Sequence, residues 1–535
     1  MTSEQALRNI RAALSAITQI PRRAERQTHT ALSETFVDIG PLFGSLKRAD
    51  HQVIYGRRGT GKTHALGNLH TWLEGKSIAV ADVDMRTIGS AGGLYGDPRE
   101  PLADRATPLL VDLAEAVHSR LVDYTLELIS NEHEVTGLVG ALDSLAAAIT
   151  DVEVIGTVEQ EDSHESTDSS SSSLGIKASL SKFDIGIEGD SKRSKASVHS
   201  SKSRVAGEVR YTVKFGPLSN AMRNVARHTP AKQVWILLDE WSAIPMELQP
   251  ILADFLRRAL LPVPGVVVKI AAVERRSLFN VPGSGDDYLG IELGSDISQD
   301  VTLDDYLIFD SESDRAGLFF EDLLARHIRA IEPGVSDYFP PTDYGRRKLT
   351  WAIWKDGAFD EFVRAAEGIP RDGINIAGLA AQRATQEWGQ EGISTDDVRQ
   401  AARAWFLRDK AGSIKAHRFA TRALGHITNF AVNRRKRTFL IERGHDSNHD
   451  IIQVLYDKRL IHLLRSGVGP GGNFDLFALD YGAYSDLLAS SEEFKSWEDS
   501  WTTGWNDLDP SRSPLVRQGI LSVAELRELP RSSEN

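Results

Sequence analysis

A glycine-rich turn between an apolar run and a helical pattern restricts the fold of this chain more than any other feature of its sequence. The turn reads GRRGTGKT at positions 56–63, after the apolar residues 53–55 and before the helix-forming residues 65–69. Its spacing is G-x-x-x-x-G-K-[ST], in which glycines let the loop fold back with its N–H groups facing inward at the start of a helix. Such a loop cradles phosphates, and the two flanks disfavour the alternative of a glycine-rich turn without a ligand.

The side chains at the end of this loop predict a bound nucleotide with magnesium. Lys62 is expected to reach the β- and γ-phosphates, and the Thr63 hydroxyl is expected to be a ligand of the Mg²⁺ that bridges them. We therefore predict ATP and Mg²⁺ as cofactors. The residues expected to contact the nucleotide are Gly56, Arg57, Arg58, Gly59, Thr60, Gly61, Lys62, Thr63 and His64.

A second stretch, residues 234–240, is an apolar run that ends in two acids, Asp239 and Glu240. Taken alone, such a run can be an ordinary strand end. Downstream of a phosphate loop, it predicts two carboxylates at the carboxyl edge of a parallel sheet, where ligands of open α/β sheets bind. Asp239 would hold the Mg²⁺ shell, and Glu240 would orient and deprotonate a water for attack on the γ-phosphate.

Composition limits the class of protein. A chain of 535 residues is too long for one core and predicts two to four domains. The absence of cysteine excludes disulfides and suits a reducing cytoplasm, where we expect a soluble protein, and residues 1–20 do not read as a signal peptide. The net charge of −13 argues against coating of nucleic acid by the whole surface, although a local basic face remains compatible with it.

The periodicity of the chain alternates between helix and strand, as in an α/β domain. Helices are predicted at 4–17, 64–74, 107–129, 138–149, 218–227, 250–260 and 316–331, and strands at 53–55, 77–84, 234–240, 265–273 and 300–308. Residues 157–206 are a Ser-rich polar insertion. Short runs of alternating apolar residues in and after it favour two or three β-segments over a plain flexible loop, and the insertion is a candidate partner-binding arm.

With both nucleotide motifs in place, the chain resembles the AAA+ class of P-loop ATPases, and within it the origin-recognition type of replication initiators and their bacterial relatives. The resemblance rests on residues 56–63, 234–240 and the Gly-Ile-Pro-Arg at 368–371. The last matches the family's sensor-2 segment, which implies that Arg371 reaches the γ-phosphate from a helical lid. The alternative is an arginine in the first turn of a surface helix.

Two features differ from the family pattern. Val273-Glu274-Arg275 stands where the family has a small polar sensor-1 residue, so sensor 1 is unassigned, and the insertion at 157–206 is foreign to the initiators. The family also uses an arginine finger from a neighbouring subunit, which would imply a homo-oligomer. The candidates for it here are Arg257, Arg258, Arg275 and Arg276.

The residues after 371 fit a lid followed by a winged helix. Lid helices are predicted at 374–387 and 396–407, the second capped at Ser394-Thr395. A strand at 438–442, a helix at 447–458, and strands at 460–464 and 474–478 around the glycine turn 467–472 are similar to a winged helix, which enters the major groove of DNA.

Three groups of side chains near the C-terminus allow two interpretations each. The basic run Arg434, Arg435, Lys436 and Arg437 either binds DNA phosphates or is a solvated face. His445, His449 and Asp450 are interpreted as a polar turn that caps a helix rather than as a metal site. Trp497, Trp501 and Trp505 share one helical face and either pack on the winged domain or dock a partner protein.

The predicted fold class is α/β: a P-loop NTPase core with a parallel sheet, followed by an α-helical lid and a C-terminal winged-helix domain. The expected divisions are an N-terminal helix (1–34), the ATPase core (35–335), the lid (336–412), the winged-helix domain (413–490) and the Trp-containing tail (491–535).

The predicted function is a Mg²⁺-dependent AAA+ ATPase, slow or partner-stimulated, whose nucleotide state controls engagement of double-stranded DNA or a partner protein by the winged-helix domain. Lys62, Glu240 and Arg371 are its expected catalytic residues, and Thr63 and Asp239 its metal ligands. The alternative function is a nucleotide-dependent scaffold or anti-phage defence sensor that binds protein rather than DNA. No membrane association is expected.

Overall fold

The structure of the protein is a computed structural model. It describes residues 3–38, 42–89, 102–131, 133–149, 214–283, 287–306, 309–386, 392–434, 436–444, 450–485, 519–523 and 526. The predictions for the insertion at 157–206, for His445 and His449, and for Trp497, Trp501 and Trp505 lie outside these residues. Among the helices that are described, none is long and apolar enough to cross a lipid bilayer.

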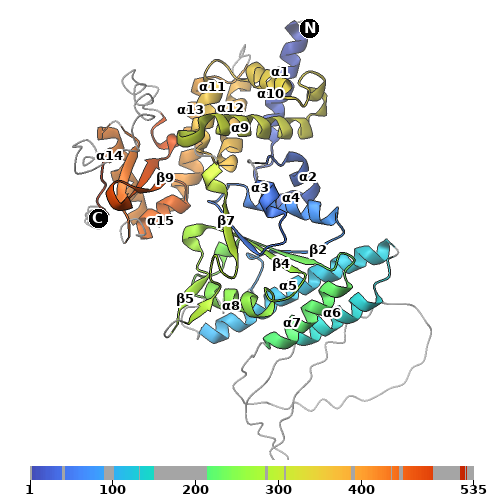
Figure 1. Cartoon of the computed structure of the whole chain (residues 1–535). Helices are drawn as coiled ribbons and strands as arrows, with labels where there is room; N and C mark the ends of the chain where they lie inside the picture. Colours follow the sequence, from blue (N-terminus) through green and yellow to red (C-terminus); the bar gives the residue numbers. More distant parts are fainter. Residues whose placement is uncertain are drawn as a thin grey trace, which may run out of the picture. The chain divides into compact units, whose positions relative to one another are not determined.

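The centre of the fold is a five-stranded sheet in a mixed α/β arrangement, as predicted (Figure 1). Its strand order is β2-β3-β4-β1-β7, and β1 pairs in parallel with β4 and with β7, as β2 does with β3. The strands are β1 (Gln52–Tyr55), β2 (Ala79–Asp84), β3 (Val234–Asp239), β4 (Val266–Ala272) and β7 (Ser298–Thr302). Every residue of β1 and β4 is buried, which explains why these strands are apolar except for Gln52 and Lys269.

One predicted strand is shorter than expected. The run 300–308 was expected to be a strand throughout, but β7 ends at Thr302 and the 3₁₀ helix η4 (Leu303–Tyr306) follows. The reason is local: the carboxylate of Asp304 accepts a hydrogen bond from the backbone N–H of Arg57 at 2.7 Å, so the chain turns toward the phosphate loop instead of continuing the ladder.

The chain divides into two compact units. The first unit comprises residues 1–75, 269–277 and 297–535, and the second comprises 76–268 and 278–296. The phosphate loop belongs to the first unit, and the acids at the end of β3 belong to the second.

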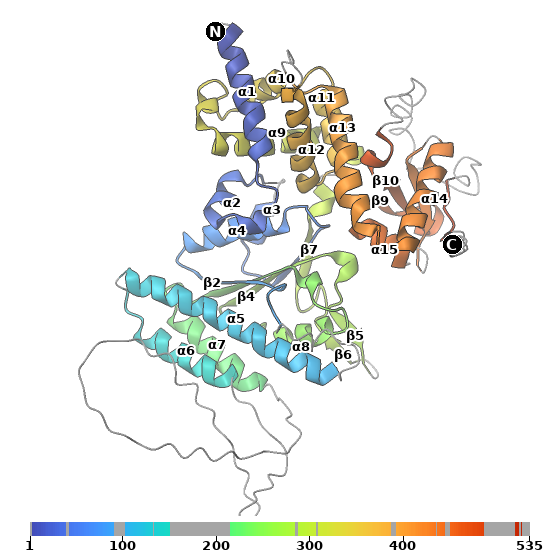
Figure 2. The same cartoon turned by 180° about the vertical axis from the view of Figure 1, so that it is seen from behind.

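Helices form a layer beside the strands of the second unit (Figures 1 and 2). They are α5 (Leu102–Ser130), α6 (Thr136–Ile149), α7 (Phe215–His228) and α8 (Gln249–Ala259). Helix α6 packs against α5 and α7, and α7 packs against α8. A hairpin of β5 (Asn280–Pro282) and β6 (Tyr288–Gly290), absent from the prediction, lies against α8.

The first unit contains a helical group in which the N-terminal helix takes part. Helix α1 (Ser3–Gln19) packs against α9 (Phe309–Ile331) and α12 (Pro370–Gln386), with its apolar stripe buried as its periodicity predicts. The other helices of the group are α10 (Asp343–Ile353), α11 (Ala358–Ala366) and α13 (Thr395–Trp405). The predicted cap of α13 is confirmed, because Ser394 and Asp397 form a reciprocal capping box.

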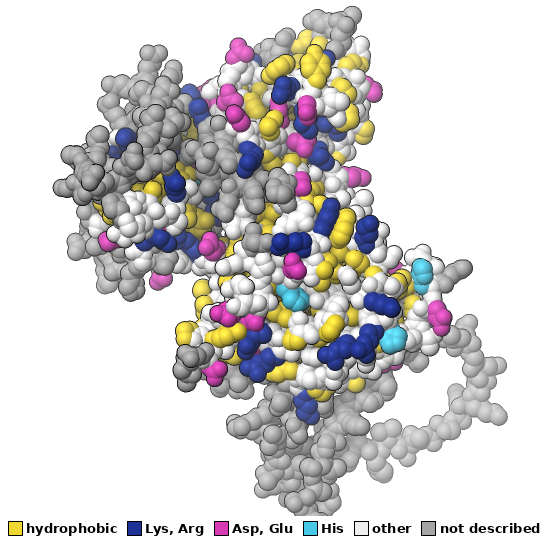
Figure 3. Space-filling view, viewed as in Figure 1, with side chains coloured by type: hydrophobic (Ala, Val, Ile, Leu, Met, Phe, Trp, Pro, Cys, Tyr) yellow, Lys and Arg dark blue, Asp and Glu magenta, His cyan; other side chains and the backbone are white. Residues whose placement is uncertain are grey.

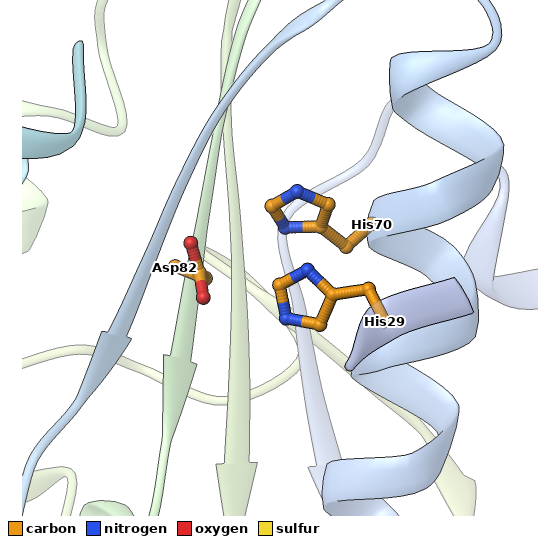
Figure 4. A group of neighbouring side chains, drawn as sticks. All are labelled: His29, His70 and Asp82. Atoms are coloured by element: carbon orange, nitrogen blue, oxygen red, sulfur yellow. The ribbon is translucent and has the colours of Figure 1, made fainter. Parts of the chain in front are cut away.

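Short helices flank the phosphate loop in the same unit. Helices α2 (His29–Thr35) and α3 (Leu42–Leu46) pack against α4 (Lys62–Glu74), the helix that follows the loop. Figure 4 shows the neighbouring imidazoles of His29 and His70, whose ring centroids lie 3.9 Å apart with the ring planes tilted by 37° and which join α2 to α4. The third labelled side chain, Asp82, comes from β2 of the second unit.

The end of the first unit is a three-stranded antiparallel sheet with two helices, which we call the C-terminal module (residues 411–485 and 519–523). Its strand order is β8-β10-β9, formed by β8 (Thr438–Glu442), β10 (Phe474–Leu479) and β9 (Ile461–Val468). Its helices are α14 (Arg418–Arg434) and α15 (Asp450–Asp457). Residues 519–521 pair with Leu440 of β8, so a segment from the far end of the chain adds to this sheet.

Candidate nucleotide-binding site

The phosphate loop has the strand-loop-helix geometry that its sequence predicts. It connects β1 to α4, and Gly61 occupies the N-cap position of α4 with φ +100°. Gly59 also has a positive φ, of +89°. Residues other than glycine rarely adopt such angles. The glycines of the motif therefore allow the loop backbone to lie at the N-terminus of α4, the positive end of the helix dipole.

Lys62 is folded back onto this loop. Its ammonium donates hydrogen bonds to the carbonyls of Gly56 at 2.7 Å and Arg57 at 2.9 Å, and the residue is 8% exposed. Charged phosphate oxygens are stronger acceptors than neutral carbonyls, so a phosphate bound on the loop would compete for this ammonium. The ammonium of Lys62 is therefore held at the loop by the protein's own carbonyls.

The residues that follow Lys62 differ in where their side chains lie. Thr63 is half-buried in the first turn of α4, whereas the His64 ring turns toward α2 and α9. His64 Nε2 lies 2.6 Å from the carbonyl of Leu32, so this nitrogen donates, and burial lowers the pKa of His64. Of the predicted nucleotide contacts, His64 can therefore supply only its backbone.

The side chain of Arg57, one of the residues predicted to contact the nucleotide, is engaged by other parts of the first unit. Its Nε donates to Asp304 at 2.7 Å, and its Nη1 lies 2.6 Å from Nδ1 of His462 in the C-terminal module. Burial alone would lower the pKa of Arg57, but Asp304 and other nearby charges hold it above its usual value. The motif permits any residue at this position, so no sequence pattern indicates these contacts of Arg57.

The candidate sensor-2 segment meets the loop through its backbone. The N–H of Arg371, in the first turn of α12, donates to the carbonyl of Gly59 at 3.1 Å. A Cβ added at Gly59 would lie 2.8 Å from Cβ of Arg371, so glycine is required for this approach. Glu367 and Gly368, both with positive φ, turn the chain into α12. The structure thus brings together two sequence motifs about 300 residues apart.

The two predicted carboxylates of the second unit stand at the end of β3. The Asp239 carboxylate accepts a hydrogen bond from the backbone N–H of Glu240 at 2.8 Å, and the Asp239 carbonyl accepts from the N–H of Met85. Glu240 has φ 56° and ψ 39°, the left-handed conformation that costs energy for a residue with a Cβ. Both side chains are half-buried, and their roles remain predictions.

Each candidate arginine finger is held in an ion pair. Arg257 and Arg258 pair with Asp254 on their own helix, both at 2.6 Å. In the first unit, Arg275 lies 3.5 Å from Asp475, and Arg276 lies 3.0 Å from Asp457. The last two ion pairs join the end of β4 to the C-terminal module, a link that the sequence did not predict.

The basic run before β8 is partly used inside the protein. Arg437 is 4% exposed and pairs with Glu367, so its guanidinium is not available to DNA in this structure, contrary to the phosphate-binding interpretation. Arg434 donates to the carbonyl of Thr438 and lies over the ring of Phe430. Lys436 is half-buried, and Arg435 lies outside the described residues. On the face drawn in Figure 3, basic and acidic side chains are interspersed.

The chain is similar to solved structures of low sequence identity. No model of a protein family matches the chain, and no curated protein matches it. Among solved structures, Drosophila ORC bound to DNA is 10% identical, with 88% of this chain and 93% of that chain covered and a TM-score of 0.30. Cdc6p from Pyrobaculum aerophilum is 12% identical, with 90% and 96% covered and a TM-score of 0.29.

Proposed function

We propose that this protein is a Mg²⁺-dependent ATPase of AAA+ type that acts as a nucleotide-controlled switch. The observation that carries the proposal is the phosphate loop: two glycines with positive φ lead into the N-terminus of α4, and the ammonium of Lys62 is already held at the loop. Oriented backbone N–H groups together with a fixed cation form a site for polyphosphate.

The roles of the other residues follow from the chemistry of phosphoryl transfer. Thr63 and Asp239 offer a hydroxyl and a carboxylate, which suit Mg²⁺, and the ion when bound would neutralise charge on the phosphates. Glu240 would orient the attacking water and accept its proton. Arg371 would add positive charge at the γ-phosphate, a role supported by the hydrogen bond between its backbone and Gly59.

The C-terminal module is proposed to be a winged-helix domain that engages duplex DNA. Helix α15 followed by a hairpin with a glycine-rich tip is the arrangement in which a helix enters the major groove and the hairpin contacts the flanking backbone. Two exposed arginines lie near that tip and are proposed to pair with phosphates: Arg465 on β9, and Arg443 directly after β8, which also contacts Asp475 and the carbonyl of Gly472.

One observation favours the alternative in which the module binds a protein. Arg434 and Arg437, half of the basic run, are committed to contacts inside the protein, which leaves less positive charge for DNA on a chain with a net charge of −13. In that case ATP would be exchanged slowly or held, and the chain would act as a scaffold or a defence sensor.

ATP binding and turnover, measured with and without duplex DNA, test the proposal. Lys62→Ala is expected to lose nucleotide binding, whereas Glu240→Gln is expected to bind ATP and not turn it over. The exposed residues Lys76 and Glu134 supply matched controls, because Lys76→Ala and Glu134→Gln remove the same charges outside the site. Normal hydrolysis by Glu240→Gln would refute its assigned role. DNA binding that weakens as salt rises would favour the DNA-binding function over the protein-binding one.

A further inference from the structure

We propose that His462 of the C-terminal module is a positioning residue for the phosphate loop and acts on it through Arg57. The proposal rests on the proposed function only in that its effect on nucleotide binding presumes that the loop binds ATP. It assigns to a buried histidine, 405 positions from Arg57, a role that no sequence motif indicates.

The phosphate loop is held from outside at three successive residues. The N–H of Arg57 donates to Asp304 at 2.7 Å, the carbonyl of Arg58 accepts from Nη1 of Arg459 at 3.4 Å, and the carbonyl of Gly59 accepts from the N–H of Arg371. These three partners come from separate segments of the first unit: η4, the turn before β9, and α12. The shape of the loop is therefore set by distant parts of the chain as well as by its own glycines.

The hydrogen bonds of His462 fix its tautomer. Nη1 of Arg57 can only donate, so Nδ1 of His462 accepts at 2.6 Å, and Nε2 must carry the proton that is donated to Asp480 at 2.9 Å. Burial lowers the pKa of His462 to about 4, which agrees with a neutral ring between a cation and an anion. The imidazole of His462 thus links Asp480 to Arg57 by two hydrogen bonds, one that it donates and one that it accepts.

The chain of contacts continues from Asp480 back to the loop. Lys410 lies between Asp480 and Asp372, and its Nζ is 2.9 Å from Oδ2 of Asp372. Nε of Arg459 is 3.4 Å from the same oxygen, and Arg459 also contacts the Arg58 carbonyl. These contacts form a closed ring of residues. It runs from Arg57 through His462, Asp480, Lys410, Asp372 and Arg459 to Arg58, the neighbour of Arg57 in the chain.

The members of this ring are buried, which makes each contact sensitive to loss of its partner. Asp372 is fully buried, and Lys410, His462 and Asp480 are each 2% exposed. A buried charge that loses its partner is poorly compensated, because water cannot replace the contact. Asp372 also follows Arg371 directly, so the ring passes through the helix start that meets Gly59.

Removing the imidazole of His462 should therefore displace Arg57 and loosen the phosphate loop. The residues that we propose to be catalytic or to bind Mg²⁺ would remain in place. For His462→Leu we expect ATP binding weakened by about tenfold or more, with turnover at saturating ATP changed much less. His462→Gln should restore binding, since its amide oxygen can accept from Arg57 while its NH₂ donates to Asp480.

Amide hydrogen exchange of the full chain gives a readout that needs no nucleotide. His462→Leu should speed exchange in the peptide that covers residues 56–61, where the Arg57 N–H is bonded to Asp304. Tyr481→Phe is the matched control, because it removes one buried hydrogen bond, to Glu361, in the same module and away from the loop. It should leave both exchange at 56–61 and ATP affinity unchanged. Should His462→Leu not fold, His462→Phe, which keeps a planar ring but cannot accept a hydrogen bond from Arg57, is expected to show the same two effects.

The outcomes separate this proposal from the proposed function. A wild-type protein that binds no ATP refutes the function, while exchange at 56–61 still decides the role of His462. A folded His462→Leu variant with wild-type exchange overturns the inference, as does a His462→Gln variant as impaired as His462→Leu. The inference holds if His462→Leu or His462→Phe speeds exchange at 56–61 and weakens ATP binding while His462→Gln and Tyr481→Phe do neither.

Discussion

At the scale of single residues, Glu240 combines a proposed chemical role with an unfavourable backbone conformation. Its left-handed φ of 56° is tolerated because neighbouring contacts fix the turn after β3, and such strain tends to occur at functional sites. Glu240→Gly should therefore raise the free energy of unfolding by about 1 kcal/mol while abolishing ATP turnover. Denaturant unfolding beside a turnover assay measures both effects, and a destabilised glycine variant would show that the conformation is not strained.

The buried histidines predict how stability depends on pH. His462 titrates at about pH 4 and His327 at about pH 3 in the folded chain, in both cases mainly because burial disfavours the charged ring. An unfolded histidine binds its proton near pH 6.5, so below that pH the unfolded state holds more protons and stability falls as pH falls. From the shift of His462 alone, the loss between pH 7.5 and pH 5 is about 2 kcal/mol.

His462→Gln provides the comparison for this pH dependence. Because glutamine does not titrate, the variant should lose about 2 kcal/mol less stability than the wild type over the same pH range. Urea unfolding at a series of pH values measures the difference. Equal slopes for the two proteins would mean that His462 is not held neutral by its surroundings.

At the scale of elements, the approach of α12 to the phosphate loop depends on a missing side chain. Gly59→Ala would place a methyl group 2.8 Å from Cβ of Arg371 at a φ of +89°, so we expect lower stability and weaker ATP binding. Gly140→Ala is the contrasting variant: Gly140 is exposed within α6 with no atom within 4 Å of the added Cβ, and it should stabilise the protein by about 0.5–1 kcal/mol. If both changes behave alike, the close approach of α12 does not constrain the loop.

Some elements of the fold could be predicted from the sequence, and others could not. Strands β1, β3 and β4 were predicted because a sheet covered on both faces needs continuous apolar runs, and α13 because Ser394 supplies its cap. Asp304, Arg459 and His462 could not be predicted as partners of the loop. Their contacts join segments hundreds of residues apart, and single buried polar residues leave no periodic pattern in a sequence.

The exposed arginines near the glycine-rich tip of the C-terminal module test the proposed DNA binding. Arg443→Ala and Arg465→Ala should each weaken duplex binding similarly for all sequences and lower the slope of log K against log salt by about 1. Titrations at several salt concentrations measure that slope. Arg437→Met is the comparison, since this arginine is buried against Glu367 and its loss should affect folding rather than the salt dependence. Unchanged slopes for both exposed arginines would favour a protein partner.

At the scale of the whole molecule, the proposed roles are divided between two compact units. Lys62, Thr63 and Arg371 belong to the first unit, and Asp239 and Glu240 to the second. Variants of each unit therefore test the proposal separately. A ligand that binds only the folded state also raises stability by mass action, so the melting temperature should rise with ATP concentration.

Calorimetric titration of the full-length protein with ATP, in the presence and absence of Mg²⁺, tests the central claim most directly. The wild type should bind one ATP per chain more tightly with Mg²⁺, Lys62→Ala should lose binding, Asp239→Asn should lose the contribution of Mg²⁺, and Lys76→Ala should match the wild type. Wild-type affinity in Lys62→Ala, or no binding of ATP by the wild type, would contradict the claim that residues 56–63 form a nucleotide site.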